Sequence, residues 1–201
     1  MANVPLIFQP LAKYADFQGR SRRSEFWLWL LFRYVVNSIA AIIAASLIMG
    51  NISYLFLTPN PDPHVFLRHY FTTIMPMIPL LGIIRLAFLI PDLAVAVRRL
   101  HDIGRTGFWL LLPFAVGIGG LIVGFVLGGF QIWSLVRLGD HINDAATFGY
   151  VLGFIGTFLL CFVLPSLVAW LVLLVFFITE GKRGPNCFGP DPKGEALNDT
   201  P

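Results

Sequence analysis

Four long apolar stretches alternate with short polar segments along the chain, at about residues 26–48, 70–97, 108–127 and 150–178. Each stretch has about twenty residues or more, the length that an α-helix needs to cross about 30 Å of hydrocarbon. Runs such as Leu167 to Ile178 have no polar side that could face a lumen, so the pattern favours helices over the strands of a barrel. We therefore expect an all-α fold, a polytopic transmembrane bundle of about four membrane-spanning helices.

Two features bear on where these helices begin and end. Pro91 lies within the second stretch, where it either kinks one long helix or ends it and starts an interfacial helix over residues 92–103. Residues 130–138 place polar side chains between apolar ones, as expected of a separate amphipathic helix on the outer membrane surface. On this interpretation residues 1–192 form a single membrane domain and residues 193–201 a flexible tail.

The composition agrees with a membrane protein. Hydrophobic residues make up 57% of the 201 residues and charged residues only 12%, whereas about 25% of the residues in soluble domains are charged. The first 25 residues contain six charged residues and no apolar core, so we expect no cleavable signal peptide. Cys161 and Cys187 are far apart along the chain and have no metal-ligand spacing, so we expect free thiols and no metal site.

The basic residues are distributed unevenly among the polar segments. Four Lys and Arg residues precede the first stretch, three follow the second and three follow the fourth, against only Arg68 and Arg137 on the opposite side. The positive-inside rule then places both termini in the cytoplasm. Trp27 and Trp29 are expected at the membrane surface, where amphipathic aromatic side chains collect. The chain is therefore expected to be a multi-pass protein of a bacterial inner (plasma) membrane.

Three polar motifs fall on the cytoplasmic side of this topology. They are Gly19-Arg20-Ser21-Arg22-Arg23-Ser24-Glu25-Phe26-Trp27, Arg98-Arg99-Leu100-His101-Asp102-Ile103-Gly104-Arg105 and Asn186-Cys187-Phe188-Gly189-Pro190-Asp191-Pro192. In this order they resemble the domain of unknown function family 805 (DUF 805), small bacterial inner-membrane proteins with a GRxxRxEFW-like opening, an RRLHD block and an NxFGPDP-like ending. The resemblance covers nearly the whole chain and implies the same topology, but it implies no particular activity. One departure is Cys187, which stands where a basic residue is common in the family.

Nine residues of these motifs are candidates for contact with a ligand or partner: Arg20, Arg23, Glu25, Arg98, Arg99, His101, Asp102, Asn186 and Asp191. Asp102 ends an inward-running helix, where the negative end of the helix dipole disfavours a carboxylate. It therefore needs a cation, either Arg98 or one from the basic cluster of the first motif. His101 and Asp102 form either an inter-helix clamp, which we favour, or an acid–base or metal-binding pair that acts on a lipid headgroup. No residue is assigned as catalytic.

Three further charged residues lie inside the apolar stretches: Arg33, Arg85 and Asp92. At about 1.5 Å per residue, Arg33 and Asp92 both lie roughly 10 Å inside the cytoplasmic boundary. Opposite charges at one depth are expected to pair across the first and second helices, because a lone charge in hydrocarbon is costly. Arg85 lies about two turns N-terminal to Asp92, and its side chain leans further away, which makes it a poorer partner.

These patterns predict a bacterial inner-membrane protein of unknown molecular activity, non-enzymatic on balance, whose cytoplasmic motif face contacts an anionic lipid or a partner protein. Two alternatives stay open: a small transporter or channel component, and a membrane-embedded lipid-modifying enzyme that uses His101 and Asp102. The expected partners are membrane lipids, including those with anionic headgroups, and either a membrane protein or a second copy of the chain. Nucleic acid is not expected, since neither fold nor spacing supports it. No cofactor is expected.

Overall fold

The computed structural model describes residues 4–57, 62–138 and 144–194 of the chain, and these residues form helices and no strand. Four helical segments are long and apolar enough to cross a membrane: Arg23–Gly50, Pro63–Asp102, Gly107–Arg137 and Thr147–Ile178. The expected all-α fold with four spanning helices is therefore confirmed for the described residues. The chain divides into two compact units, which are described separately: unit 1 is Met1–Asp102 with Arg183–Pro201, and unit 2 is Ile103–Lys182.

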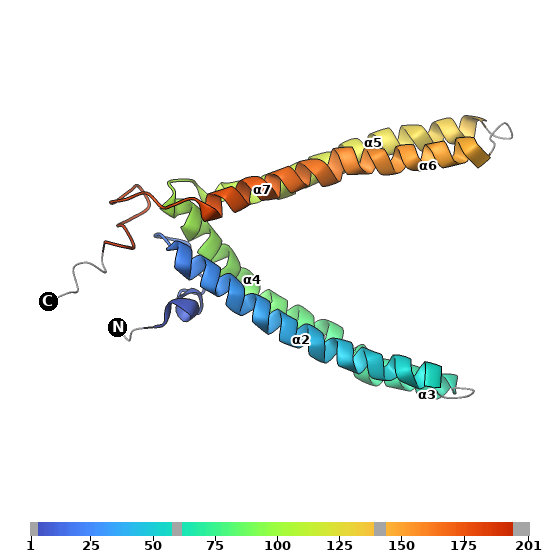
Figure 1. The fold of residues 1–201 in the computed structure, drawn as a ribbon, viewed down its shortest axis with the longest axis horizontal. Helices are drawn as coiled ribbons and strands as arrows, with labels where there is room; N and C mark the ends of the chain where they lie inside the picture. The colour runs from blue at the N-terminus through green and yellow to red at the C-terminus, as the bar shows by residue number, and fades with distance from the viewer. Residues whose placement is uncertain (1–3, 58–61, 139–143, 195–201) are drawn as a thin grey trace. The chain divides into compact units, whose positions relative to one another are not determined.

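Unit 1 is built on two long helices that run side by side, α2 (Arg23–Leu57) and α4 (Met77–Asp102) (Figure 1). Most of their large apolar side chains are exposed, as a surface that faces lipid requires, and the buried ones gather where α2 begins and α4 ends. We call this part of unit 1 the motif end. The shorter elements of the unit are η1 (Leu6–Phe8), α1 (Gln9–Ala12), α3 (Pro63–His69) and the π-helical η2 (Tyr70–Ile74).

The ends of the two long helices of unit 1 differ from those that the apolar pattern indicated. α2 continues to Leu57, well past residue 48, where the first apolar stretch ends. α4 runs through Pro91 without a break, so the proline neither ends this helix nor starts an interfacial one. A proline removes only one hydrogen bond from the helix ladder, and its ring is buried here, so packing holds the helix together on both sides.

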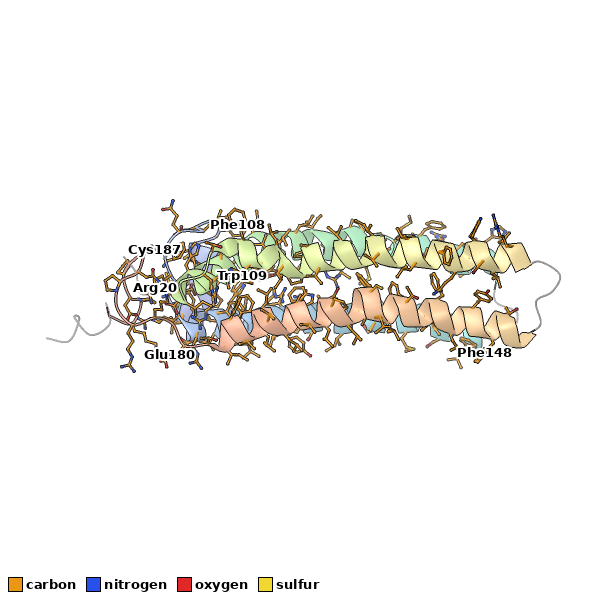
Figure 2. The ribbon with its side chains drawn as sticks, turned by 90° about the horizontal axis from the view of Figure 1, so that it is seen from above. Arg20, Phe108, Trp109, Phe148, Glu180 and Cys187 are labelled. Atoms are coloured by element: carbon orange, nitrogen blue, oxygen red, sulfur yellow. The ribbon has the colours of Figure 1, made fainter. Side chains whose placement is uncertain are left out.

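Unit 2 is a hairpin of two long helical rods, one outgoing and one returning (Figure 1). Figure 2 shows Phe108, Trp109 and Glu180 at one end of this unit and Phe148 at the opposite end. The outgoing rod consists of η3 (Gly107–Leu111) and α5 (Leu112–Leu138), and the returning rod consists of α6 (Asp144–Phe158), the π-helical η5 (Leu159–Val163) and α7 (Leu164–Ile178).

Two glycines allow the rods of unit 2 to approach closely. A Cβ atom on Gly120 would overlap the backbone carbonyl of Cys161, and one on Gly128 would come within 2.9 Å of the Phe154 ring. Gly124, halfway between them, has no such neighbour within 4 Å. Small residues at four-residue spacing are a common means of close helix packing in membranes. Glycine is therefore required by the packing at Gly120 in particular, because a backbone carbonyl cannot move aside as a side chain can.

The expectation of a separate amphipathic helix at residues 130–138 is wrong, because α5 runs through them unbroken. Gln131 Nε2 donates a hydrogen bond to Thr157 Oγ1 on the returning rod (2.9 Å). The guanidinium carbon of Arg137 lies 3.9 Å from the centre of the Trp133 ring. Two of the polar side chains that the sequence pattern assigned to a membrane surface thus make contacts within the hairpin, although Gln131 Oε1 is buried and accepts no hydrogen bond among the described residues.

Candidate functional site

Asp102, the last residue of α4, is held by two arginines at the motif end. Its Oδ1 accepts a hydrogen bond from Arg20 Nε at 3.0 Å, and its Oδ2 accepts one from Arg99 Nη1 at 2.5 Å. The side chains of Arg20, Arg99 and Asp102 are 1%, 0% and 6% exposed. These charge-assisted bonds offset the unfavourable helix dipole at Asp102. The predicted cation thus comes from the first motif and from Arg99.

Arg98 faces a different carboxylate, that of Glu25. Its Nη2 lies 3.5 Å from Glu25 Oε1, and the two side chains are 1% and 4% exposed. In the described part of the chain, neither this oxygen nor the three nitrogens of the Arg98 guanidinium have a hydrogen-bond partner, and neither does the buried Ser21 hydroxyl. A buried ion pair without hydrogen bonds recovers little of its desolvation cost. The motif end therefore has a second polar cluster, which is less well satisfied than the one around Asp102.

The third motif closes over His101. Asn186 Nδ2 donates a hydrogen bond to the His101 carbonyl (2.9 Å), and Asn186 Oδ1 accepts one from the Phe188 amide (2.9 Å). The Phe188 ring stacks on the imidazole, with ring centres 4.0 Å apart and planes 4° apart. From the first motif, the Gly19 carbonyl accepts a hydrogen bond from His101 Nδ1 at 3.2 Å. His101 thus joins segments from all three motifs.

Asp191 keeps the tail segment folded upon itself. Its carboxylate accepts hydrogen bonds from the backbone amides of Lys193 and Gly184, each at 2.9 Å. These two bonds lower the pKa of Asp191, because they favour the charged form. They stabilise the segment while Asp191 is ionised, and that contribution is lost as the pH falls through the lowered pKa. Arg20 Nη1 donates to the Gly184 carbonyl at 2.6 Å, which ties the segment to the first motif.

A hollow of about 440 Å³ lies beside these contacts, and we call it the basic pocket. Three of its side chains are cationic and one is a carboxylate. Arg22 forms part of its wall and donates from Nε to the Pro192 carbonyl at 2.5 Å. Of the nine predicted residues, only Arg20 and Glu25 line this pocket, and Arg23 is exposed at the start of α2. The pocket is lined by Leu6, Gln9, Lys13, Gly19, Arg20, Arg22, Glu25, Pro190 and Pro192.

The predicted pairing of Arg33 with Asp92 is confirmed. Arg33 Nη1 lies 2.9 Å from Asp92 Oδ2, and the indole nitrogen of Trp29 donates to Asp92 Oδ1 at 2.7 Å. Trp29 is 1% exposed, so its indole packs inside unit 1 and does not face the lipid headgroups as expected. Its indole N–H serves the carboxylate within unit 1, which explains its burial. Arg85 is exposed and has no ion pair or hydrogen bond among the described residues.

The segment before Gly19 takes part in the site, which the sequence pattern did not predict. Tyr14 donates its hydroxyl hydrogen to the Ala87 carbonyl of α4 at 2.6 Å, and the Phe8 ring packs edge-on against Phe32 of α2. Gln9 and Lys13 then come to line the basic pocket. A signal was present: the segment carries a proline near the start of its short helix and apolar residues before and after it. Residues 5–19 are therefore part of the site.

Two relatives from Escherichia coli (strain K12) resemble the chain over nearly its whole length. Inner membrane protein YhaI is 30% identical over 183 residues, which cover 91% of this chain and 91% of that protein. Inner membrane protein YhaH is 26% identical over 185 residues, covering 92% of this chain and 93% of that protein. No solved structure matches the chain significantly. With four helices able to span a bilayer, the chain is a multi-pass protein of the inner membrane.

A family model matches residues 14–190. This range takes in the first two motifs and most of the third, as well as all four apolar stretches. The chain therefore belongs to the family described as "Protein of unknown function (DUF805)".

Proposed function

We propose that this chain is a non-enzymatic inner-membrane protein that binds the anionic headgroup of a phospholipid in its basic pocket, on the cytoplasmic side. The observation that carries the proposal is the charge of the pocket, where Lys13, Arg20 and Arg22 face a single carboxylate, Glu25. The charge of Arg20 is paired with Asp102, whereas Arg22 donates its Nε to a neutral carbonyl, so Lys13 and Arg22 are the cations that a ligand would meet. Basic side chains beside a membrane attract anionic lipids by about 1 kcal/mol each.

The surroundings of the pocket favour a lipid over a soluble phosphate. The segment that forms one wall carries large apolar side chains that are 39% to 42% exposed. Exposed apolar side chains beside a basic pocket suit the boundary between headgroups and acyl chains. A phosphate there would also lie close to the first turn of α2, whose dipole favours an anion. The exposed side chains are Val4, Phe8, Leu11, Tyr14 and Phe17.

The geometry of His101 and Asp102 argues against an enzyme centred on this pair. Both oxygens of Asp102 accept hydrogen bonds from arginines, and the His101 ring is covered by Phe188. A general acid or base must reach the proton that it transfers, and neither group points into the basic pocket. Among the described residues, no group of three or more His, Cys, Asp and Glu side chains could hold a metal ion. A clamp between the motifs accounts for the pair better.

The proposal is tested by measuring lipid binding to full-length protein in nanodiscs of phosphatidylcholine with added phosphatidylglycerol. Changing both Lys13 and Arg22 to Gln should weaken binding of phosphatidylglycerol roughly tenfold or more, since two cations at about 1 kcal/mol each are removed. Arg23→Gln is the matched control, because Arg23 is exposed nearby and does not line the pocket. Unchanged binding by the double variant, or an equal loss with Arg23→Gln, would contradict the proposal.

The cytoplasmic orientation is a further part of the proposal, and the uneven distribution of Lys and Arg supports it. Reporter fusions should place residues near Gly104 and Gly194 in the cytoplasm. Fusions near Pro61 and Asn143, which lie outside the described residues, should report the periplasm. A periplasmic signal at Gly104 would overturn this orientation, and the basic pocket would then face the outer leaflet.

A further inference from the structure

A second hollow, of about 570 Å³, opens between α2 and α4 within the membrane-spanning part of unit 1, and we call it the intramembrane groove. It contains two arginines and one aspartate, so its side chains carry one excess positive charge. It differs from the basic pocket in its residues and in its depth. The groove is lined by Leu30, Arg33, Tyr34, Asn37, Arg85, Phe88, Leu89 and Asp92.

The single carboxylate of the groove is already committed. Trp29 donates to one oxygen of Asp92 and Arg33 to the other. Asn37 is also occupied, because its Nδ2 donates to the Arg33 carbonyl at 2.9 Å. Arg33 Nε is buried without a hydrogen-bond partner in the described part of the chain, and Arg85 has neither a hydrogen bond nor an ion pair there. The groove thus has arginine donors without a partner among the described residues, while its one carboxylate is already paired.

Arg85 lies deep within its helix. At about 1.5 Å per residue, it is roughly 25 Å from Asp102 and roughly 12 Å from Met77, the two ends of α4. Helical side chains lean toward the N-terminus, so that of Arg85 leans away from Asp92. A lone cation in the hydrocarbon region is strongly disfavoured and usually marks a binding site or a partner. Arg85 therefore needs an anion at this level.

The chain itself offers no such anion. Asp92 is the only acidic residue in the four apolar stretches of the sequence. Neither unit 2 nor a second copy of the chain can therefore bring an uncommitted carboxylate to this depth. The counter-charge must come from a molecule other than this protein, and that molecule must be able to enter the bilayer.

We propose that the intramembrane groove binds an anionic amphiphile, whose phosphate or carboxylate pairs with Arg85 and whose acyl chain lies along the apolar wall of Leu30, Phe88 and Leu89. A hydrated inorganic anion would leave this wall unfilled. Leu89 is 48% exposed and Tyr34 70% exposed on the outer surface of unit 1, so a ligand can enter sideways from the lipid. Arginine suits both headgroups, because its planar fork of donors matches two oxygens at once.

The test uses full-length protein in phosphatidylcholine nanodiscs with one photoactivatable probe at a time. The anionic probes are a diazirine phosphatidylglycerol and a diazirine fatty acid, and a diazirine phosphatidylcholine is the neutral comparison. Crosslinked peptides are mapped by mass spectrometry. At least one anionic probe should label residues 30–37 or 85–92 several times more than the neutral probe does. The anionic probe that labels more strongly shows whether the ligand carries a phosphate or a carboxylate. Inorganic phosphate at millimolar concentration should not reduce the labelling.

Arg85→Gln should reduce this labelling about tenfold, which corresponds to ~1.4 kcal/mol. Arg85→Lys keeps the positive charge but lacks the planar guanidinium, so it should retain part of the labelling. Arg137→Gln is the matched control, because Arg137 is another exposed arginine of a spanning helix. Three results would each overturn the proposal: equal labelling by all three probes, a loss of labelling when inorganic phosphate is added, or labelling of Arg85→Gln equal to that of the wild-type protein. The Lys13 and Arg22 double variant should label the groove normally, which separates this site from the basic pocket.

Discussion

Replacing Asp102 with alanine should lower the free energy of unfolding of unit 1 by about 3–5 kcal/mol, the usual cost of removing one partner from a buried ion pair. The change leaves Arg20 and Arg99, whose side chains are 1% and 0% exposed, without their shared carboxylate. It also removes one of the contacts that hold the first motif to the end of α4, because Arg20 bridges Asp102 and the Gly184 carbonyl. Unfolding of detergent-solubilised protein, followed by tryptophan fluorescence, measures the loss.

The matched control is Asp191→Ala, which removes a carboxylate from the same end of the unit. Among the described residues, Asp191 accepts hydrogen bonds from two backbone amides of its own segment and none from an arginine, so its loss should loosen the tail and cost clearly less than the loss of Asp102. Asp102→Asn should fall between the two, since an amide keeps some hydrogen bonding and loses the charge. Equal stability of Asp102→Ala and the wild-type protein would show that water replaces the carboxylate and that the clamp is unimportant.

The helical secondary structure and the number of spanning helices were predictable from the sequence, because few kinds of backbone structure can span a bilayer. Every backbone polar group must be satisfied inside the hydrocarbon, so the length of an apolar run is enough to predict a helix. Where a helix continues into water, this argument no longer applies. For that reason the extension of α2 to Leu57 was missed. The continuity of α5 was missed as well. Its polar residue Gln131 bonds to Thr157 of α6, and the sequence pattern does not show that α6 packs against this part of α5.

The pairing of Arg33 with Asp92 was predictable, because the depth of a side chain in the membrane follows from the number of residues between it and the end of its helix. The partners of Asp102 were not, because two arginines precede it by one turn, at three and four residues. Arg99 faces Asp102 and Arg98 faces Glu25. The choice depends on how α4 is rotated about its axis against α2, and both spacings allow an ion pair. Rotation is fixed by packing, which the hydrophobic pattern of a lipid-exposed helix barely constrains.

Contacts of the terminal segments were also beyond the sequence analysis. The stacking of Phe188 on His101 joins residues 87 positions apart, and the bond from Tyr14 to Ala87 joins residues 73 positions apart. Neither segment has a long periodic pattern that would assign it a face or a partner. The motifs indicated which residues belong to the site, and only the structure indicates which of them touch each other.

The pairing of Arg33 with Asp92 should appear as a coupling in a double-mutant cycle. Arg33→Ala and Asp92→Ala should each destabilise the protein by about 2–3 kcal/mol, because each leaves the other charge alone in hydrocarbon. Asp92→Ala should cost more than Arg33→Ala, since it also removes the acceptor of the buried Trp29 indole. The double variant has lost both charges of the pair, so neither is left without its partner, and its loss should be less than the sum of the single losses by about 1–2 kcal/mol.

Arg85→Ala is the control that makes this cycle specific. Arg85 lines the same groove and carries the same charge, yet it has no ion pair in the described part of the chain. Without an added lipid ligand, Arg85→Ala should leave the free energy of unfolding unchanged or increase it, because the variant lacks an uncompensated cation. Strict additivity of the Arg33 and Asp92 losses would contradict the pair. A loss at Arg85→Ala as large as that at Arg33→Ala would show instead that any arginine in the groove stabilises unit 1, whether or not it pairs with Asp92.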